Sequence, residues 1–195
     1  KHIENVHRFG LPVVVAINSF SFDTPEEIQF IKDKCAYLSV KSVQADHWAR
    51  GGAGAEVLAQ AVVEVAETTK TDFTLLYPDT CTLWQKVGII CREIYGATDV
   101  LADKKLREKF QRLQDDGFGH LPICMAKTQY SLSTDPGLLG RPKRFDVPLR
   151  DVHVAAGAGF VVVLTGDILT MPGLPKTPAA ESIDIDEQEN VVGLF

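Results

Sequence analysis

The first strongly apolar stretch of the chain, LPVVVAI at residues 11–17, contains no polar residue and is rich in β-branched side chains. A short continuous apolar run of this kind is typical of a strand that is buried on both faces in a parallel sheet. After this stretch, apolar residues recur at the three- and four-residue spacing of a helix, at Ile28, Ile31, Cys35 and Leu38. A second strand is predicted at residues 39–43 (SVKSV). Residues 11–43 therefore predict a βαβ unit with a right-handed crossover.

The helix of this unit has a strong start signal. Thr24 suits the N-cap position, and Pro25 suits the first helical turn, where its missing N–H leaves no hydrogen bond unmade. Glu27 stands three residues after Thr24, which is the spacing of a capping box. These residues predict that the helix begins directly after Thr24.

The hydrophobic pattern of the rest of the chain also predicts alternating helices and strands. Helices are predicted at residues 55–67, 83–95 and 104–114, and strands at 121–126 and 160–169, with a looser strand pattern between them. We therefore predict an α/β fold: a mostly parallel βαβ-type sheet flanked by helices, followed by a C-terminal segment rich in strands and loops. The helical βαβ-type part covers residues 1–116, and the strand- and loop-rich part covers residues 117–195.

Two predicted loops meet at one edge of the sheet. Ligands of open parallel sheets bind beyond the carboxyl ends of the strands, which places Asn18, Phe20 and Phe22 near His47 and Trp48. Aromatic rings on neighbouring loops can clamp a flat ring, with a contribution of ~1–3 kcal/mol per ring. The alternative is that Phe20 and Trp48 only cover the end of the sheet.

Asn18 and three other residues are candidates for contact with a substrate or nucleotide. Gly51 and Gly52 lie between a strand and a helix, so their backbone N–H groups could face an anion, although a tight turn explains them equally well. Lys127 follows a predicted strand and could touch a phosphate, or it is an ordinary surface lysine.

Composition narrows the classes of partner. The chain has 195 residues, of which 45% are hydrophobic and 24% charged, as expected for a folded domain. Its formal net charge of −6 argues against binding of nucleic acid or anionic membranes through the overall field. No apolar stretch approaches the ~20 residues that span a bilayer. The four cysteines lack CxxC spacing and lie in apolar patterns, which favours buried free thiols in a reducing cytoplasm over disulfides or zinc ligands.

Several longer stretches together resemble the formate–tetrahydrofolate ligase family, also called 10-formyltetrahydrofolate synthetase. They are FGLPVVVAINSF (9–20), HWARGGAGA (47–55), EIYGA (93–97), GFGHLPICMAKTQYSLS (117–133), LLGRP (138–142) and GAGFVVVLTGDILTMPGLPKTPAAESIDID (157–186). The resemblance runs over essentially the whole chain.

The resemblance implies that the chain is the C-terminal portion of a longer enzyme. Family enzymes hold the phosphates of ATP with a P-loop in their N-terminal part, and no G-x-x-x-x-G-K-[ST] motif occurs here. The chain also starts at Lys1 rather than Met. Catalytic residues are therefore expected in the absent N-terminal part, which would be this chain's partner. The chain alone is expected to be inactive and to bind no cofactor tightly.

The same resemblance implies the reaction. The complete enzyme would use formate, tetrahydrofolate and ATP with Mg²⁺, pass through formyl phosphate, and release 10-formyltetrahydrofolate, ADP and phosphate. A cytoplasmic homo-oligomer is expected.

Within the family, an aromatic pair stacks on the pterin ring, and the matching positions here are Phe20 (motif A-[IV]-N-x-F) and Trp48 (motif W-[AS]-x-G-G). The family usually has Pro-Thr or Lys-Thr after this phenylalanine, whereas this chain has Ser21 and Phe22. A turn without proline is less restricted in φ, so a looser slot is expected. The alternative reading is a non-catalytic assembly or regulatory module that keeps the fold without the ligand.

Overall fold

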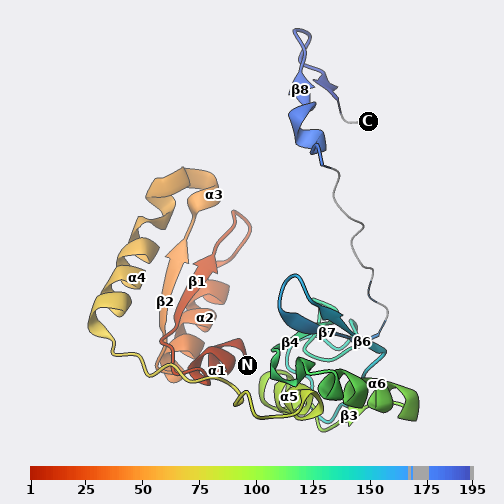
Figure 1. The fold of residues 1–195 in the computed structure, drawn as a ribbon. Coiled ribbons are helices and arrows are strands. Elements are labelled where there is room, and N and C mark those ends of the chain that lie inside the picture. The colour runs from red at the N-terminus through yellow and green to blue at the C-terminus, as the bar shows by residue number, and fades with distance from the viewer. Residues whose placement is uncertain (167, 169–175, 194–195) are drawn as a thin grey trace.

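The computed structural model describes residues 1–166, 168 and 176–193, and it confirms the α/β class. Figure 1 shows two lobes: a βαβ lobe of residues 11–68, drawn in orange to yellow, and a mixed lobe of residues 83–166, drawn in green to blue-green. Residues 176–193 contain the short helix η4 (Ala179–Glu181) and a hairpin of β8 (Asp184–Ile185) and β9 (Val191–Val192). The TMPGLP motif at residues 170–175 lies outside the described residues.

Two parallel strands form the centre of the βαβ lobe. They pair in register, with Val14 opposite Lys41 and Asn18 opposite Ala45, which confirms the predicted βαβ unit. Helices α2 and α4 pack against both strands (Figure 1). The elements are β1 (Val14–Asn18), α2 (Pro25–Tyr37), β2 (Lys41–Ala45), α3 (His47–Arg50), the 3₁₀ helix η1 (Gly51–Ala55) and α4 (Glu56–Thr68).

Helix α2 begins where the sequence predicts. The Thr24 hydroxyl accepts a hydrogen bond from the Glu27 backbone N–H at 3.3 Å, and the Glu27 carboxylate accepts one from the Thr24 N–H at 2.9 Å. Both halves of the capping box are therefore present.

Three details of the predicted βαβ unit are wrong, and one is that the first strand starts at Val14 rather than at residue 11. The second strand starts at Lys41 rather than residue 39, because Ser39 has a left-handed φ of 56° that ends the helix and cannot belong to a strand. The first strand is not buried on both faces: Ile17 is buried, whereas Ala16 and Asn18 are exposed. A sheet of two strands is too narrow for its helices to cover it completely.

The outer edge of β1 is unpaired in the part of the chain that the structure describes. Ser19 donates its backbone N–H to the Ala45 carbonyl at 3.0 Å. Since backbone groups alternate along a strand, those of Val15 and Ile17 also point toward β2, and those of Val14, Ala16 and Asn18 point to the outer edge. β1 is therefore an edge strand.

The mixed lobe combines two small sheets with helices. Strands β3 and β5 form a parallel pair, and β4, β7 and β6 form a three-stranded sheet in which only β6 is antiparallel. The elements are α5 (Leu83–Ile89), η2 (Ile90–Tyr95), β3 (Val100–Leu101), α6 (Lys104–Asp115), η3 (Phe118–His120), β4 (Ile123–Ala126), β5 (Val147–Pro148), β6 (Asp151–Ala155) and β7 (Phe160–Leu164).

The main hydrophobic core lies inside the mixed lobe. Its members come from both sides of residue 116, where the sequence analysis divides the chain: Leu83, Val87, Cys91, Ala97, Val100, Leu106, Phe110, Val147, Leu149, Val152, Val161 and Val163. This core ties helices α5 and α6 to the strands that follow them.

The predicted helix at residues 83–95 changes its hydrogen-bonding pattern partway. It is α-helical as α5 and then continues as a π-helix, η2, which ends at Gly96 with a left-handed φ of 78°. Such π segments are uncommon and concentrate at functional sites. Arg92 lies directly over Gly88, with guanidinium atoms 3.1–3.4 Å from where a side-chain Cβ would stand.

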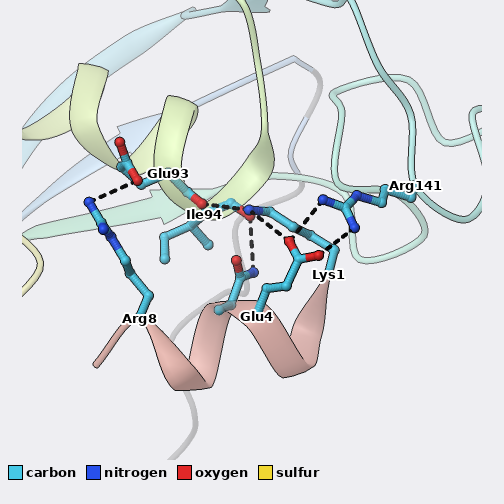
Figure 2. A network of polar contacts seen from close by, with 7 residues as sticks. Lys1, Glu4, Arg8, Glu93, Ile94 and Arg141 are labelled. Atoms are coloured by element: carbon cyan, nitrogen blue, oxygen red, sulfur yellow. Dashed lines mark hydrogen bonds and ion pairs between the residues drawn. The ribbon is translucent and has the colours of Figure 1, made fainter. Parts of the chain in front are cut away.

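Helix α1 (His2–His7) precedes the βαβ lobe in sequence, but its polar contacts reach the mixed lobe (Figure 2). Lys1 Nζ donates to the Glu93 carbonyl at 2.7 Å, and Asn5 Nδ2 donates to the Ile94 carbonyl at 3.0 Å. Arg141 binds the Glu4 carboxylate through two hydrogen bonds of 2.7 and 2.8 Å. These contacts fasten helix α1 and Lys1 to the mixed lobe.

The described residues contain no candidate membrane-spanning helix, and their cysteines are not joined in disulfides. No helix there combines the length and the apolar character that crossing a bilayer requires. All four cysteines are free thiols; Cys35 and Cys91 are buried as expected, whereas Cys124 is exposed. Burial raises the pKa of the Cys91 thiol to about 12.

Candidate functional site

The predicted edge of the sheet exists. Strands β1 and β2 end side by side at Asn18 and Ala45, and the residues that follow them form a turn and helix α3, respectively. Ser19 fastens the two strand ends together, because both its N–H and its hydroxyl donate to the Ala45 carbonyl, at 3.0 and 3.3 Å.

Three aromatic rings gather at this edge, and we call Phe20, Phe22 and Trp48 the aromatic cluster. The ring centroids of Phe20 and Trp48 are 5.7 Å apart with their planes tilted by 31°. The rings of Phe20 and Phe22 are stacked, 6.0 Å apart and within 9° of parallel. All three rings are exposed, so they form a contiguous aromatic surface and do not close off a core. The structure thus brings together the predicted pair, Phe20 and Trp48.

Asp23 fixes the turn that carries two of these rings. Its backbone N–H donates to the Phe20 carbonyl at 3.1 Å, and its carboxylate accepts the Phe20 N–H at 2.7 Å. These two bonds hold the turn without a proline. The loose slot expected from Ser21 and Phe22 is therefore offset by the side chain of Asp23.

A hollow of about 420 Å³ adjoins Phe20. It is lined by Ser19, Phe20, Asp23, Pro25, Ile28, Gln29, Lys32 and Gln44. Amide, carboxylate and ammonium groups next to a ring can hydrogen-bond the edge of a heterocycle while the ring contacts its face. Asn18 instead lines a second hollow of about 370 Å³ beside the outer edge of β1 and α2.

The glycines after Trp48 have different structural requirements. Gly51 has φ 58° and ψ −143°, a conformation that only glycine adopts readily, so turn geometry explains it. Gly54 lies against Asp46 and His47, where a Cβ would come within 2.7 Å of their atoms. Gly52 has neither requirement, because its φ is not left-handed and the space around it is open. Of the two predicted glycines, Gly52 is the one without a structural explanation.

Lys127 is not part of this site. It follows β4 in the mixed lobe, where its ammonium group donates to the carbonyls of Thr128 (2.7 Å) and Ser131 and lies 5.2 Å from the centre of the Tyr95 ring. Partial burial lowers the pKa of Lys127, and burial also raises the pKa of Tyr95. A pocket of about 510 Å³ beside them is lined by residues of α1, η2 and the segment 127–140, and by none of the aromatic cluster.

Sequence reasoning placed Phe22 at this edge but gave it no binding role, and it did not include Asp23 in the site. Phe22 stands two positions after Phe20, and Asp23 stands three positions after it, the spacing that closes a β-turn. That spacing was the available signal. Among the described residues, no group of three or more His, Cys, Asp or Glu side chains is arranged to hold a metal ion.

The comparisons with known proteins agree with the resemblance seen in the sequence. The family model described as formate–tetrahydrofolate ligase matches residues 1–195. Curated proteins named formate–tetrahydrofolate ligase are 53% identical in Granulibacter bethesdensis, 53% in Sinorhizobium medicae and 49% in Ruegeria pomeroyi. Each match covers 100% of this chain but only 34%, 34% and 35% of the relative, so the chain spans about a third of their length. With the family model matched from end to end, the chain belongs to the formate–tetrahydrofolate ligase family.

Proposed function

We propose that this chain supplies the folate-binding part of a ligase that joins formate to tetrahydrofolate at the expense of ATP. The observation that carries the proposal is the aromatic cluster at the carboxyl edge of β1 and β2, with Phe20 and Trp48 in ring contact and exposed. A pterin is a flat heterocycle with a polar edge. The rings and the polar hollow beside Phe20 offer it both kinds of contact.

The proposed reaction has two steps. A formate oxygen attacks the γ-phosphorus of ATP, so that a new O–P bond forms and ADP leaves. N10 of tetrahydrofolate then attacks the carbon of formyl phosphate, phosphate leaves, N10 loses its proton, and 10-formyltetrahydrofolate results. This chain's contribution is to hold the folate so that N10 is oriented toward the formyl carbon.

Phosphate chemistry is assigned elsewhere in the complete enzyme. The sequence has no P-loop motif, and among the described residues no group of three or more His, Cys, Asp or Glu side chains is arranged to hold a metal ion. No step is therefore routed through a metal held by this chain. Placement of the chain in the C-terminal portion, its division at residue 116, homo-oligomer formation and a cytoplasmic location stay predictions.

Titration calorimetry with tetrahydrofolate tests the proposal. We expect binding to the chain, loss of that binding in Trp48→Ala, and no loss in the control Phe30→Ala, which removes an exposed ring on α2. We also expect no ADP from the chain with formate, ATP and tetrahydrofolate. If the chain alone does not bind, the same variants are measured in the complete ligase. Unchanged folate affinity of Trp48→Ala there overturns the proposal.

A non-catalytic assembly module is the second candidate, and exposed apolar side chains on the helices of the βαβ lobe favour it. They are Phe30, Ile31, Tyr37, Val57, Val62 and Val63. Under this reading, charged substitutions on α2 and α4 weaken assembly of the complete enzyme, and Trp48→Ala leaves folate affinity unchanged.

A further inference from the structure

Phe22 is the most exposed ring of the aromatic cluster. Its side chain is 82% exposed, against 57% for Trp48 and 41% for Phe20. A ring so open to water adds little to folded stability, because almost none of its apolar area is removed from water. It is nevertheless held in a near-parallel stack on Phe20. Exposed apolar groups in a contiguous patch indicate recognition of a ligand or partner.

Phe20 is the middle ring of the three. It contacts both Phe22 and Trp48, and no ring contact joins Phe22 to Trp48 in the described part of the chain. Phe22 can therefore influence a ligand at Trp48 through the position of Phe20.

The position of the Phe20 ring matters because of its distance from the Trp48 ring. A flat ring sandwiched between two others needs about 7 Å between them, twice the ~3.5 Å carbon contact distance. Phe20 and Trp48 are 5.7 Å apart, so their rings must separate to admit a pterin between them. The Phe20 backbone is held by Asp23, which leaves its side chain as the part that can move.

We propose that Phe22 is a positioning residue for folate, which stacks on Phe20 and sets where the Phe20 ring rests when the pterin enters. The proposal rests on the proposed function, because it requires Phe20 and Trp48 to bind the pterin. It adds a third residue that acts on the folate only through Phe20. A ring stack of this kind changes an affinity by about twofold to tenfold.

Steady-state kinetics of the complete ligase that carries this sequence provide the test. We expect Phe22→Ala to raise the KM for tetrahydrofolate about twofold to tenfold, with kcat and the KM values for formate and ATP unchanged. Phe22→Tyr keeps the ring and should behave as the parent. Phe22→Leu keeps apolar bulk without a planar ring and should resemble Phe22→Ala. Phe30→Ala removes a ring that is 73% exposed from α2 and should change none of these values.

A double-mutant cycle with Phe20→Ala separates the outcomes. If Phe22 acts through Phe20, Phe22→Ala has no further effect once Phe20 is alanine. A persisting effect in that background overturns the positioning role, and so does a fall in kcat or a rise in the KM for ATP. An unchanged folate KM for Phe22→Ala overturns it while Phe20→Ala and Trp48→Ala still raise that KM. Unchanged values for all three variants overturn the proposed function itself.

Discussion

The two lobes differ in where their apolar side chains lie. The mixed lobe gathers a continuous core around Phe110, Val147 and Val161, whereas the buried apolar residues of the βαβ lobe are few and mostly small. The βαβ lobe leaves large side chains such as Phe30 and Tyr37 in water. One lobe is held by packing, and the other relies more on local hydrogen bonds such as its capping box and the Asp23 turn. The exposed aromatic cluster belongs to the second kind.

The sharpest way to test this comparison is to remove one phenylalanine from each lobe. Phe110 is 3% exposed and meets Trp84 edge-on at 5.4 Å, so Phe110→Ala should lower the free energy of unfolding by about 3–5 kcal/mol. Phe30→Ala should change it by less than about 0.5 kcal/mol. Urea unfolding followed by circular dichroism measures both. Equal losses in the two variants contradict the comparison.

A second contrast concerns lysines. Lys86 is fully buried, and its ammonium group donates to the carbonyls of Gly119 at 2.8 Å and Leu121 at 3.0 Å. Lys86→Met keeps the volume but leaves two carbonyls without a donor, which should cost about 2–4 kcal/mol. Lys41 on β2 forms an exposed ion pair with Glu64, so Lys41→Met should cost about 0–1 kcal/mol.

Thermal unfolding of the two lysine variants decides this prediction. A Lys86→Met protein as stable as the parent would mean that the buried ammonium group has no structural role. Lys86→Ala, which also opens a cavity, should be the least stable of the three variants.

The smallest expected effect is a difference in how the stability of two helix starts depends on pH. α2 uses the carboxylate of Glu27, whereas α5 uses the neutral amide of Gln85 on Thr82. Hydrogen bonds from Thr24 lower the pKa of Glu27 below its ordinary value of 4.5. Since the folded pKa is the lower one, the stabilisation is complete above pH 4.5 and is lost as the pH falls through the folded value.

Amide hydrogen exchange at the start of each helix measures this difference. Exchange protection at α2 should fall in acid while that at α5 does not, after correction for intrinsic exchange rates. Glu27→Gln should remove the pH dependence at α2. Identical acid responses of the two helices, or a persisting response in Glu27→Gln, would contradict the assignment.

Sequence reasoning was most accurate where the signal is local. The Thr24 capping box, the parallel pairing of β1 with β2 and the meeting of Phe20 with Trp48 follow from short-range spacing and the geometry of parallel strands. The left-handed Ser39 and the π-helix at Ile90–Tyr95 carry no comparable pattern. Short strands such as β3, with two residues, exist because Val100 pairs with Val147, far away in the chain.

Lys127 shows what a strand end leaves open. Its position after β4 suggested contact with a phosphate, which stays a prediction, and nearby carbonyls accept two of the three N–H groups of its ammonium. The sequence does not reveal that the 128–131 loop folds back over the lysine. Gly51 suggested an anion site because it lies between a strand and a helix. Its backbone conformation requires glycine whether or not an anion binds there.

The unpaired outer edge of β1 has a consequence for the behaviour of the chain at high concentration. The N–H and C=O groups of Val14, Ala16 and Asn18 point outward from a strand that carries no charge and no proline within Val14–Asn18. Natural sheets usually protect such edges with charges, proline or a covering segment, because an open edge is a template for the strand of another molecule. The segment VVVAI also has the β-branched, uncharged composition of strands that stack into fibrils. In isolation, this chain is expected to aggregate from β1 first.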